Sequence, residues 1–440
     1  MNNNLYFSKY NIFNKIADSN EYYLVNLLSG NADILDADKA QDIIDGKYSD
    51  IDELTSKGYL INPAEEKKNY TTKYLDFIEQ RDSDEVQIFF VPWYACNFDC
   101  TYCYQSGYTN EKNVLTKEII DSFFNYVNSE FKSRKKYLTL FGGEPLLAAP
   151  SNRELILYFM EKAKENNLDT AIVTNGYHLE DYLSELINFN IREIQVTLDG
   201  NSGMHDLRRP LKGGKSTFEK IASGISIALN NYVNINLRMV IDRQNIETLP
   251  ELANYAIEKG WIKSPYFKTQ LGRNYELHYC QNDNEKLLSR IQFYEYIYKL
   301  VKQYPHIIEF HKPAFSISKY LFDNGELPLP LFDSCTGCKT EWAFDYTGKI
   351  YSCTATVGKE KESLGTYYPE IKLDKAAVEE WEERDVTTIE ECKSCNLQLA
   401  CGSGCASVAF NRTGKLHSPD CRPISELIGM GISLYYNEEN

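Results

Sequence analysis

Three cysteines stand close together in the first quarter of the chain, at the spacing C-x3-C-x2-C. They are Cys96, Cys100 and Cys103. Thiolates at such short, uneven spacings are typical of iron–sulfur clusters, whereas a structural zinc site uses four ligands, usually from two C-x2-C pairs. Three ligands on a four-iron cluster leave one iron open to a small molecule. The pattern predicts a catalytic cluster; a structural cluster or three unrelated core cysteines is the alternative reading.

Two further motifs follow, each at the carboxyl end of an apolar segment that reads as a buried strand. Tyr137 to Phe141 runs directly into Gly142-Gly143-Glu144-Pro145, and Ile194 to Leu198 runs into Asp199-Gly200. Glycines let the backbone approach a ligand closely, and a carboxylate can accept hydrogen bonds from an ammonium group. Alone, the first motif would be an ordinary turn. Its place one β/α unit after the cysteine loop favours a functional role.

Together these motifs resemble those of the radical S-adenosylmethionine (radical SAM) enzymes. The resemblance implies that the open iron binds the amino and carboxylate groups of S-adenosylmethionine, and that one electron then yields a 5′-deoxyadenosyl radical, which abstracts hydrogen from unactivated carbon. It further implies a cellular one-electron donor such as a flavodoxin or ferredoxin. The cofactor-binding residues that it implies are Tyr102, Gly142, Gly143, Glu144 and Thr197.

The resemblance also suggests individual roles. Glu144 and the glycine backbone would hold the methionine amino group, Thr197 would face the ribose or carboxylate, and Tyr102 would pack near the adenine. Related enzymes often have a basic residue near Arg208 and Arg209. Which arginine, if either, meets the substrate stays open, and a solvated surface loop explains the pair equally well.

Apolar runs alternate with amphipathic stretches through this region, as a parallel β/α fold requires. This predicts an α/β fold, a partial (β/α)6 TIM-like barrel with the motifs at the carboxyl ends of its strands, where barrel active sites form. The expected strands are Val86 to Val91, Leu138 to Phe141, Ala171 to Thr174, Glu193 to Leu198, Asn234 to Ile241 and Tyr266 to Gln270; the expected helices include Lys117 to Phe131, Arg153 to Lys164 and Phe218 to Asn230.

Eight of the other nine cysteines lie between positions 335 and 421. Their spacing resembles the SPASM extension of radical peptide-modifying enzymes, which carries two auxiliary 4Fe-4S clusters, and eight thiolates suit two fully ligated clusters. The family's interleaved pattern implies one ligand set of Cys335, Cys338, Cys353 and Cys405, and a second set of Cys392, Cys395, Cys401 and Cys421.

Several alternatives stay open for this cysteine-rich region. Cys335 and Cys338 are closer in sequence than in relatives, so either Cys335 is not a ligand or the first auxiliary cluster keeps an open iron for a substrate thiolate. Two zinc ribbons are the alternative to clusters. Disulfides are disfavoured because a signal peptide and a long apolar run are both missing, which predicts a reducing cytoplasm. Cys280 is left over, and we expect it to be a small buried hydrophobe.

The first 80 or so residues precede the barrel. Leu5 to Phe13 and Glu21 to Asp36 read as strands with a hairpin turn at 29–31, and helical segments follow at 37–44 and 51–57. A winged-helix-like α+β module fits, and in layout it resembles the leader-recognition elements of peptide maturases, which bind a leader at a sheet edge. A structural cap on the barrel is the alternative. The predicted domains are residues 1–80, 81–310 and 311–440.

Composition excludes some partners. The 440-residue chain carries a formal net charge of −16, which argues against nucleic acid or an anionic membrane as the main partner. SPASM enzymes mostly act on peptides or proteins. The related sulfatase maturases, which make formylglycine, have an aspartate at the position of Thr354 and begin almost at the cluster loop. We therefore expect a peptide maturase that forms a thioether or other side-chain crosslink; a sulfatase-type maturase, and a non-catalytic cluster-bearing binding or electron-transfer protein, are the alternatives.

Overall fold

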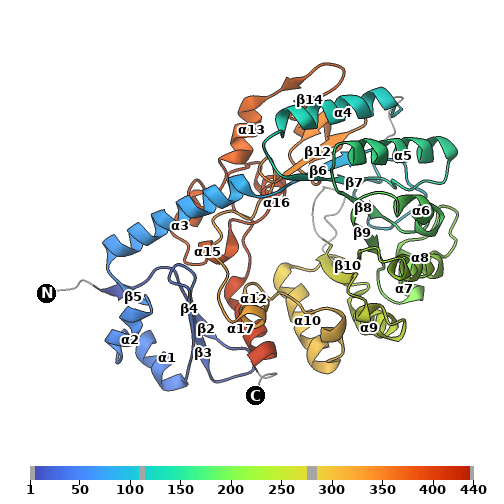
Figure 1. Cartoon of the computed structure of the whole chain (residues 1–440). Helices are drawn as coiled ribbons and strands as arrows, with labels where there is room; N and C mark the ends of the chain where they lie inside the picture. Colours follow the sequence, from blue (N-terminus) through green and yellow to red (C-terminus); the bar gives the residue numbers. More distant parts are fainter. Residues whose placement is uncertain (1–4, 109–113, 275–284, 437–440) are drawn as a thin grey trace.

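The computed structural model describes residues 5–108, 114–274 and 285–436. Figure 1 shows an N-terminal module, a β/α barrel and a C-terminal region whose chain lies between them. Cys280 falls outside the described residues, so its expected burial stays a prediction. Among the helices of the described ranges, none combines the length and the apolar character needed to cross a membrane.

Six parallel strands form the barrel sheet, and neighbours in the sheet are neighbours in the chain. Each strand predicted from the sequence in this region is present. Each of the first five strands has buried apolar residues, as expected for strands covered by helices, whereas the last strand, at the sheet edge, has none. The strands are β6 (Val86–Val91), β7 (Lys136–Leu140), β8 (Thr170–Thr174), β9 (Ile191–Thr197), β10 (Ile235–Ile241) and β11 (Phe267–Arg273).

Helices between these strands cover the outside of the sheet (Figure 1). The first begins at a Thr116 side chain that accepts from Ile119 N, and it buries an apolar face that includes Phe123. The Phe123 ring packs on Phe90 of β6 and Phe159 of the next helix. The helices are α4 (Lys117–Glu130), α5 (Pro150–Glu165), α6 (Leu179–Leu186), α7 (Ser202–Arg208), α8 (Phe218–Asn230) and α9 (Leu249–Glu258).

A C-terminal strand extends the barrel sheet, which the sequence did not predict. Strand β12 (Glu341–Asp345) pairs in parallel with β6, and the short strands β13 (Lys349–Tyr351), β14 (Gly365–Thr366) and β15 (Lys372–Leu373) continue antiparallel to give ten strands. This pairing brings the cysteines that flank β12 and β13 to the side of the barrel.

The N-terminal module contains the predicted α+β elements. Strands β2 (Asn11–Lys15), β3 (Tyr22–Asn26) and β4 (Asn31–Leu35) form an antiparallel sheet, and β1 (Tyr6–Phe7) pairs with β5 (Leu60–Ile61). Helices α1 (Ala37–Ile44) and α2 (Ile51–Ser56) follow. The long helix α3 (Pro63–Ser83) then runs to the first barrel strand, so the expected boundary at residue 80 falls inside a helix (Figure 1).

The chain after the barrel strands contains eight further α-helices among the described residues. They are α10 (Arg290–Gln303), α11 (Ile307–Phe310), α12 (Ser318–Asn324), α13 (Lys375–Glu382), α14 (Glu390–Lys393), α15 (Gln398–Cys401), α16 (Ala406–Thr413) and α17 (Ile424–Tyr435). The N-terminal sheet packs on the last of them. Tyr23 is fully buried there and its hydroxyl donates to Ser425 O at 2.8 Å. The module is therefore part of one packed unit with the C-terminal region.

Candidate active site

A cavity of about 320 Å³ opens at the carboxyl ends of the barrel strands. Its wall contains all three cysteines of the C-x3-C-x2-C motif, the two glycines after β7 and Thr197 at the end of β9. Thr354 and Ala355, which follow Cys353 in the C-terminal region, line the same cavity. The barrel motifs and the C-terminal region thus meet around one space.

The cysteine loop is fixed by its backbone. Asp99 N donates to Pro210 O at 2.9 Å, and Thr101 N donates to Arg208 O at 3.0 Å. Burial, with a smaller contribution from Glu144, raises the pKa of the Cys96 thiol to about 12. Burial also raises the pKa of Cys100 to about 11, although the Arg209 charge opposes this. The thiols would bind metal as thiolates, so metal must displace their protons.

The chemistry of these donors fits a cluster better than a single ion. Among the described residues, no three His, Cys, Asp or Glu side chains converge as closely as one metal ion requires. A four-iron cluster places each thiolate on a different iron, so its ligands surround a larger volume. Three thiols around a cavity suit that arrangement.

Gly142 and Gly143 form the cavity wall with backbone. Both have positive φ, +89° and +52°, which L side chains rarely adopt. A Cβ on Gly143 would lie 2.4 Å from Ala95 O, so a side chain cannot be accommodated there without moving the cysteine loop. Gly143 N donates to the Gln105 side chain at 2.8 Å, which ties the glycine motif to the segment after Cys103.

Glu144 differs from the sequence expectation. Its carboxylate is 1% exposed and accepts hydrogen bonds from Thr174 Oγ1 and Asn175 N, both at 2.6 Å, and from Leu146 N at 2.8 Å. Burial raises the pKa of Glu144, whereas these hydrogen bonds lower it. The side chain therefore joins the loops after β7 and β8, and the glycine backbone rather than this carboxylate faces the cavity.

The two arginines at the C-terminal end of α7 are both buried, so the surface-loop alternative is wrong. Arg208 is 1% exposed and pairs with Asp242 at 2.8 Å, while its guanidinium lies 4.7 Å from the Tyr102 ring centroid. Arg209 is 8% exposed, and its Nη1 donates to the Tyr102 hydroxyl at 2.6 Å. Both arginines thus hold Tyr102, and only Arg209 lines the cavity.

Sequence reasoning missed several cavity residues. Arg238, next to Thr197 in the sheet register, and Arg273 bring positive charge to the wall. The buried atoms Gln105 Nε2, Arg209 Nε and Arg238 Nε have no hydrogen-bond partner among the described residues. Buried donors normally have partners, so these three suit an anionic or carbonyl ligand. A charged residue within an otherwise apolar predicted strand was the available signal for Arg238.

The eight C-terminal cysteines influence one another electrostatically. Burial raises the pKa of each of Cys338, Cys353 and Cys405, and the charge of Cys335 raises it further. Burial also raises the pKa of Cys392 to about 12, with further contributions from Cys401, Cys395 and Cys421. These interactions connect members of the same implied ligand set, and the assignment of the two sets stays a prediction.

A family model described as the Radical SAM superfamily matches residues 90–256, which include the barrel motifs described above. Residues 90–256 form a radical SAM domain. This domain and the chain's relatives show that the protein is an enzyme. A radical SAM domain uses S-adenosylmethionine and a 4Fe-4S cluster, and the three thiols and unpartnered donors of the cavity fit both.

The curated relatives of this chain include anaerobic sulfatase-maturating enzymes and GTP 3′,8-cyclases. The chain is 25% identical over 354 residues to a serine-type anaerobic sulfatase-maturating enzyme of Bacteroides thetaiotaomicron, covering 72% of this chain and 82% of the relative. It is 22% identical over 324 residues to a cysteine-type enzyme of the same name from Clostridium perfringens, covering 71% and 86%. A probable GTP 3′,8-cyclase of Sulfurisphaera tokodaii is 26% identical over 295 residues, covering 64% and 85%.

Solved structures show the same fold. The chain superposes on anSMEcpe with bound AdoMet at a TM-score of 0.62 and 18% identity, covering 81% of this chain and 94% of the other. It superposes on Streptococcus suis SuiB bound to precursor peptide SuiA at a TM-score of 0.52 and 14% identity, covering 96% and 100%. The partial barrel expected from the sequence is therefore confirmed.

Proposed function

We propose that this radical SAM enzyme modifies a ribosomally made precursor peptide, forming a thioether or other side-chain crosslink. The observation that carries the proposal is the shared cavity: the cysteine loop and the Thr354–Ala355 segment of the C-terminal region border one space of about 320 Å³. A peptide side chain in that space would lie beside both the radical source and the C-terminal region. The SuiB structure, bound to a precursor peptide, supports this reading.

The residues of the cavity have distinct tasks in this proposal. Cys96, Cys100 and Cys103 hold the cluster, and the backbone at 142–143 lies beside the cofactor. Arg238 and Arg209 offer buried donors to its carboxylate. When bound, S-adenosylmethionine and the cluster supply a carbon-centred radical that removes hydrogen from the peptide. The barrel walls keep water from that radical, and an external one-electron carrier, such as a flavodoxin or ferredoxin, reduces the cluster.

Two auxiliary 4Fe-4S clusters complete the proposal. Cys335, Cys338, Cys353 and Cys405 would hold the first, and Cys392, Cys395, Cys401 and Cys421 the second. Each set has four thiols and so can fill every iron site of a cubane. The first set lies directly behind the Thr354–Ala355 wall, where it can accept the electron released when the substrate radical becomes product.

The N-terminal module would hold the leader of the precursor. Strand β4 pairs with β3 alone among the described strands, and a groove of about 100 Å³ lies between β4 and helices α1 and α2. Ile44 and Ile51, which adjoin the lining residues Ile43 and Asp50 in the chain, are 55% and 51% exposed. An unpaired strand edge next to exposed apolar side chains suits a peptide that adds as a further strand.

Iron content tests the cluster assignment. After anaerobic reconstitution, wild type should contain about 12 irons, and the variant with Cys96, Cys100 and Cys103 changed to alanine about 8. About 4 irons in wild type, with zinc bound elsewhere, would show that the C-terminal cysteines form zinc sites. That outcome would remove the two auxiliary clusters from the proposal.

Leader binding is best tested with point variants. Deleting the module would uncover Tyr23 and the α17 surface on which it packs, so a deletion would confound binding with folding. We expect the double variant Ile44→Glu, Ile51→Glu to weaken leader binding about 10-fold or more, as loss of an apolar anchor does. The matched control is Leu75→Glu on α3, also exposed at 61%. Equal affinity for all three proteins would contradict the assignment of the leader site.

A sulfatase-type maturase is the second candidate, favoured by the two sulfatase-maturating relatives. Against it, Thr354 occupies the cavity wall and donates its hydroxyl to the Glu341 carboxylate at 3.1 Å. A threonine hydroxyl does not act as a base at neutral pH. Formylglycine in a sulfatase-derived cysteine or serine peptide, detected by mass spectrometry, would establish this candidate instead.

A further inference from the structure

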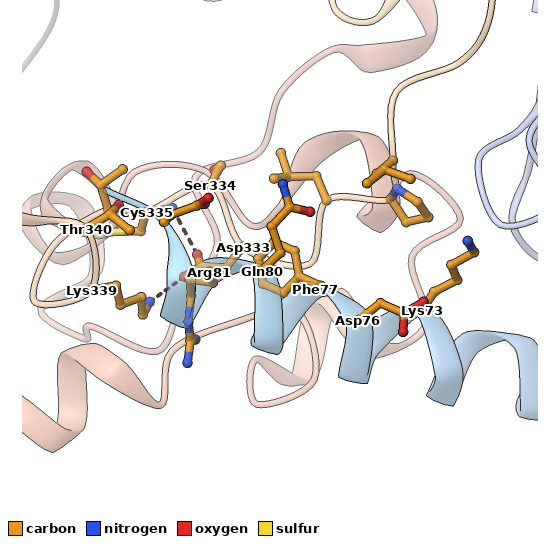
Figure 2. A pocket seen from close by; sticks show the side chains of 15 residues that line it. Lys73, Asp76, Phe77, Gln80, Arg81, Asp333, Ser334, Cys335, Lys339 and Thr340 are labelled. Carbon is orange, nitrogen blue, oxygen red and sulfur yellow. Dashed lines mark hydrogen bonds and ion pairs between the residues drawn. The ribbon is translucent and has the colours of Figure 1, made fainter. Parts of the chain in front are cut away.

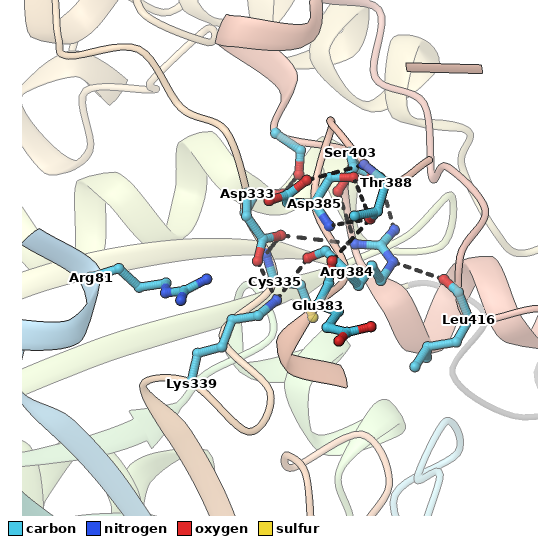
Figure 3. Close-up of polar contacts among 12 residues, drawn as sticks. Arg81, Asp333, Cys335, Lys339, Glu383, Arg384, Asp385, Thr388, Ser403 and Leu416 are labelled. Carbon is cyan, nitrogen blue, oxygen red and sulfur yellow. Dashed lines mark hydrogen bonds and ion pairs between the residues drawn. The ribbon is translucent and has the colours of Figure 1, made fainter. Parts of the chain in front are cut away.

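Arg384 is a fully buried cation that the radical chemistry does not use. It follows α13, and its guanidinium donates to backbone carbonyls from separate parts of the chain (Figure 3). Nε donates to Leu416 O at 2.8 Å, Nη2 to Ser418 O at 2.9 Å and to Ser403 O at 3.2 Å, and Nη1 to the Ser403 hydroxyl at 2.9 Å. A buried charge is costly without such partners, so this site is built for arginine.

The segments that Arg384 contacts carry cysteines of both sets. Ser403 lies between Cys401 of the second set and Cys405 of the first, and Ser418 precedes Cys421 by three residues. Ser403 has a φ of +63°, which non-glycine residues rarely adopt and which persists only when the surroundings hold it. Arg384 therefore fixes the segment that connects Cys401 of the second set to Cys405 of the first.

The same network of hydrogen bonds and ion pairs extends through Asp333 to Cys335. The Asp333 carboxylate accepts from Cys335 N at 2.9 Å, pairs with the buried Lys339 ammonium, and lies 3.9 Å from Arg384 Nη1. Lys339 Nζ also donates to Arg384 O at 2.9 Å. The side chains of all three residues are at most 3% exposed. Two cations and one anion give this buried group a net charge of +1.

The network also borders a second cavity. A space of about 540 Å³ lies between α3 and residues 329–340, and Asp333, Cys335 and Lys339 form part of its wall (Figure 2). It shares no lining residue with the cavity at the barrel. Cys335 therefore has the charged network on one side and a large cavity on another.

We propose that Arg384, Asp333 and Lys339 are positioning residues for the auxiliary clusters: they fix the ligand loops, and their net positive charge raises the reduction potential of the cluster held by Cys335. The inference rests on the proposed auxiliary clusters. A nearby positive charge stabilises the more negative, reduced form of a cluster, and groups outside the ligand shell are known to tune such potentials. The first auxiliary cluster would thereby accept an electron from the substrate radical more readily.

Substitutions of opposite sign test the charge effect. Asp333→Asn raises the net charge to +2 and should shift the midpoint potential of one auxiliary cluster upward; Lys339→Met lowers it to 0 and should shift the same potential downward. Both are made in the variant with Cys96, Cys100 and Cys103 changed to alanine, so that only auxiliary clusters titrate by electron paramagnetic resonance. The matched control is Lys312→Met, which removes a surface ion pair with Asp323 and should shift nothing.

Arg384 tests the positioning effect. Arg384→Gln should lose iron from both sets, because the crossover at Ser403 is released, whereas Arg384→Lys keeps the charge and should retain more iron. Shifts of the same sign for the Asp333 and Lys339 variants, or no shift at full iron content, would overturn the inference while leaving the clusters established. Absence of auxiliary iron in the parent protein would instead overturn the proposed function. If Lys339→Met does not fold, the upward shift of Asp333→Asn decides alone.

Discussion

The barrel loop and the C-terminal region both contain several cysteine thiols, but they surround them differently. Cys96, Cys100 and Cys103 line a cavity that also contains unpartnered donors. The eight C-terminal thiols lie in loops held by backbone hydrogen bonds and by the buried Arg384. Three thiols beside a cavity leave room for a ligand on the metal. Under the proposed cluster assignment, four thiols on each auxiliary cluster would leave none, so the first region would be the place for chemistry and the second would store electrons.

The largest expected effect separates the two regions directly. Cys100→Ala should reduce formation of 5′-deoxyadenosine to background, because the open cluster loses a ligand. The matched control, Cys395→Ala, should lose about 4 irons yet keep S-adenosylmethionine cleavage within about twofold, since Cys395 does not line the barrel cavity. The measurement is chromatography of 5′-deoxyadenosine after reduction with dithionite. Equal loss in both variants would show that the two regions do not work separately.

A smaller effect should follow from Gly143→Ala. The new Cβ would meet Ala95 O at 2.4 Å and would take a positive φ, so the cysteine loop must shift. We expect strain of about 1–3 kcal/mol and weaker S-adenosylmethionine binding, measured by calorimetry on reconstituted protein. Gly213→Ala is the control: its φ is +94°, but open space surrounds it. If both variants bind alike, the close approach at Gly143 has no part in cofactor binding.

The smallest expected effect concerns the charge of the cavity. Arg238→Ala removes a buried donor next to Thr197, and a typical hydrogen bond contributes a net of about 0.5–1.5 kcal/mol. The Michaelis constant for S-adenosylmethionine should therefore rise about 10-fold, while Lys268→Ala on the adjacent strand, with its side chain 62% exposed, should not change it. An unchanged constant for Arg238→Ala would place this arginine with the peptide instead of the cofactor.

Much of this architecture could be predicted from the sequence. The strand from Val86 to Val91 and the helix from Phe218 to Asn230 have the expected bounds, because their apolar periods are clear and their ends carry polar residues. The parallel pairing of β12 with β6 could not be predicted, since it joins segments about 250 residues apart and local patterns carry no information on such contacts. The hydrogen bonds of Glu144 to Thr174 and Asn175 could not be predicted either, because these partners lie on the next strand unit, and the role of Glu144 in cofactor binding stays a prediction.

Helix α3 has a consequence for the substrate. Its hydroxyl groups at Tyr70 and Tyr74 bond to Gln398 and Asp385, and both rings pack on Phe332, so the helix cannot swing. Its 21 residues span about 30 Å at 1.5 Å per residue. An extended peptide covers that distance with about nine residues. If the N-terminal module holds the leader, this fixed helix keeps the module at a constant distance from the barrel. The residue to be modified would then be selected by its distance from the leader rather than by its neighbours in sequence.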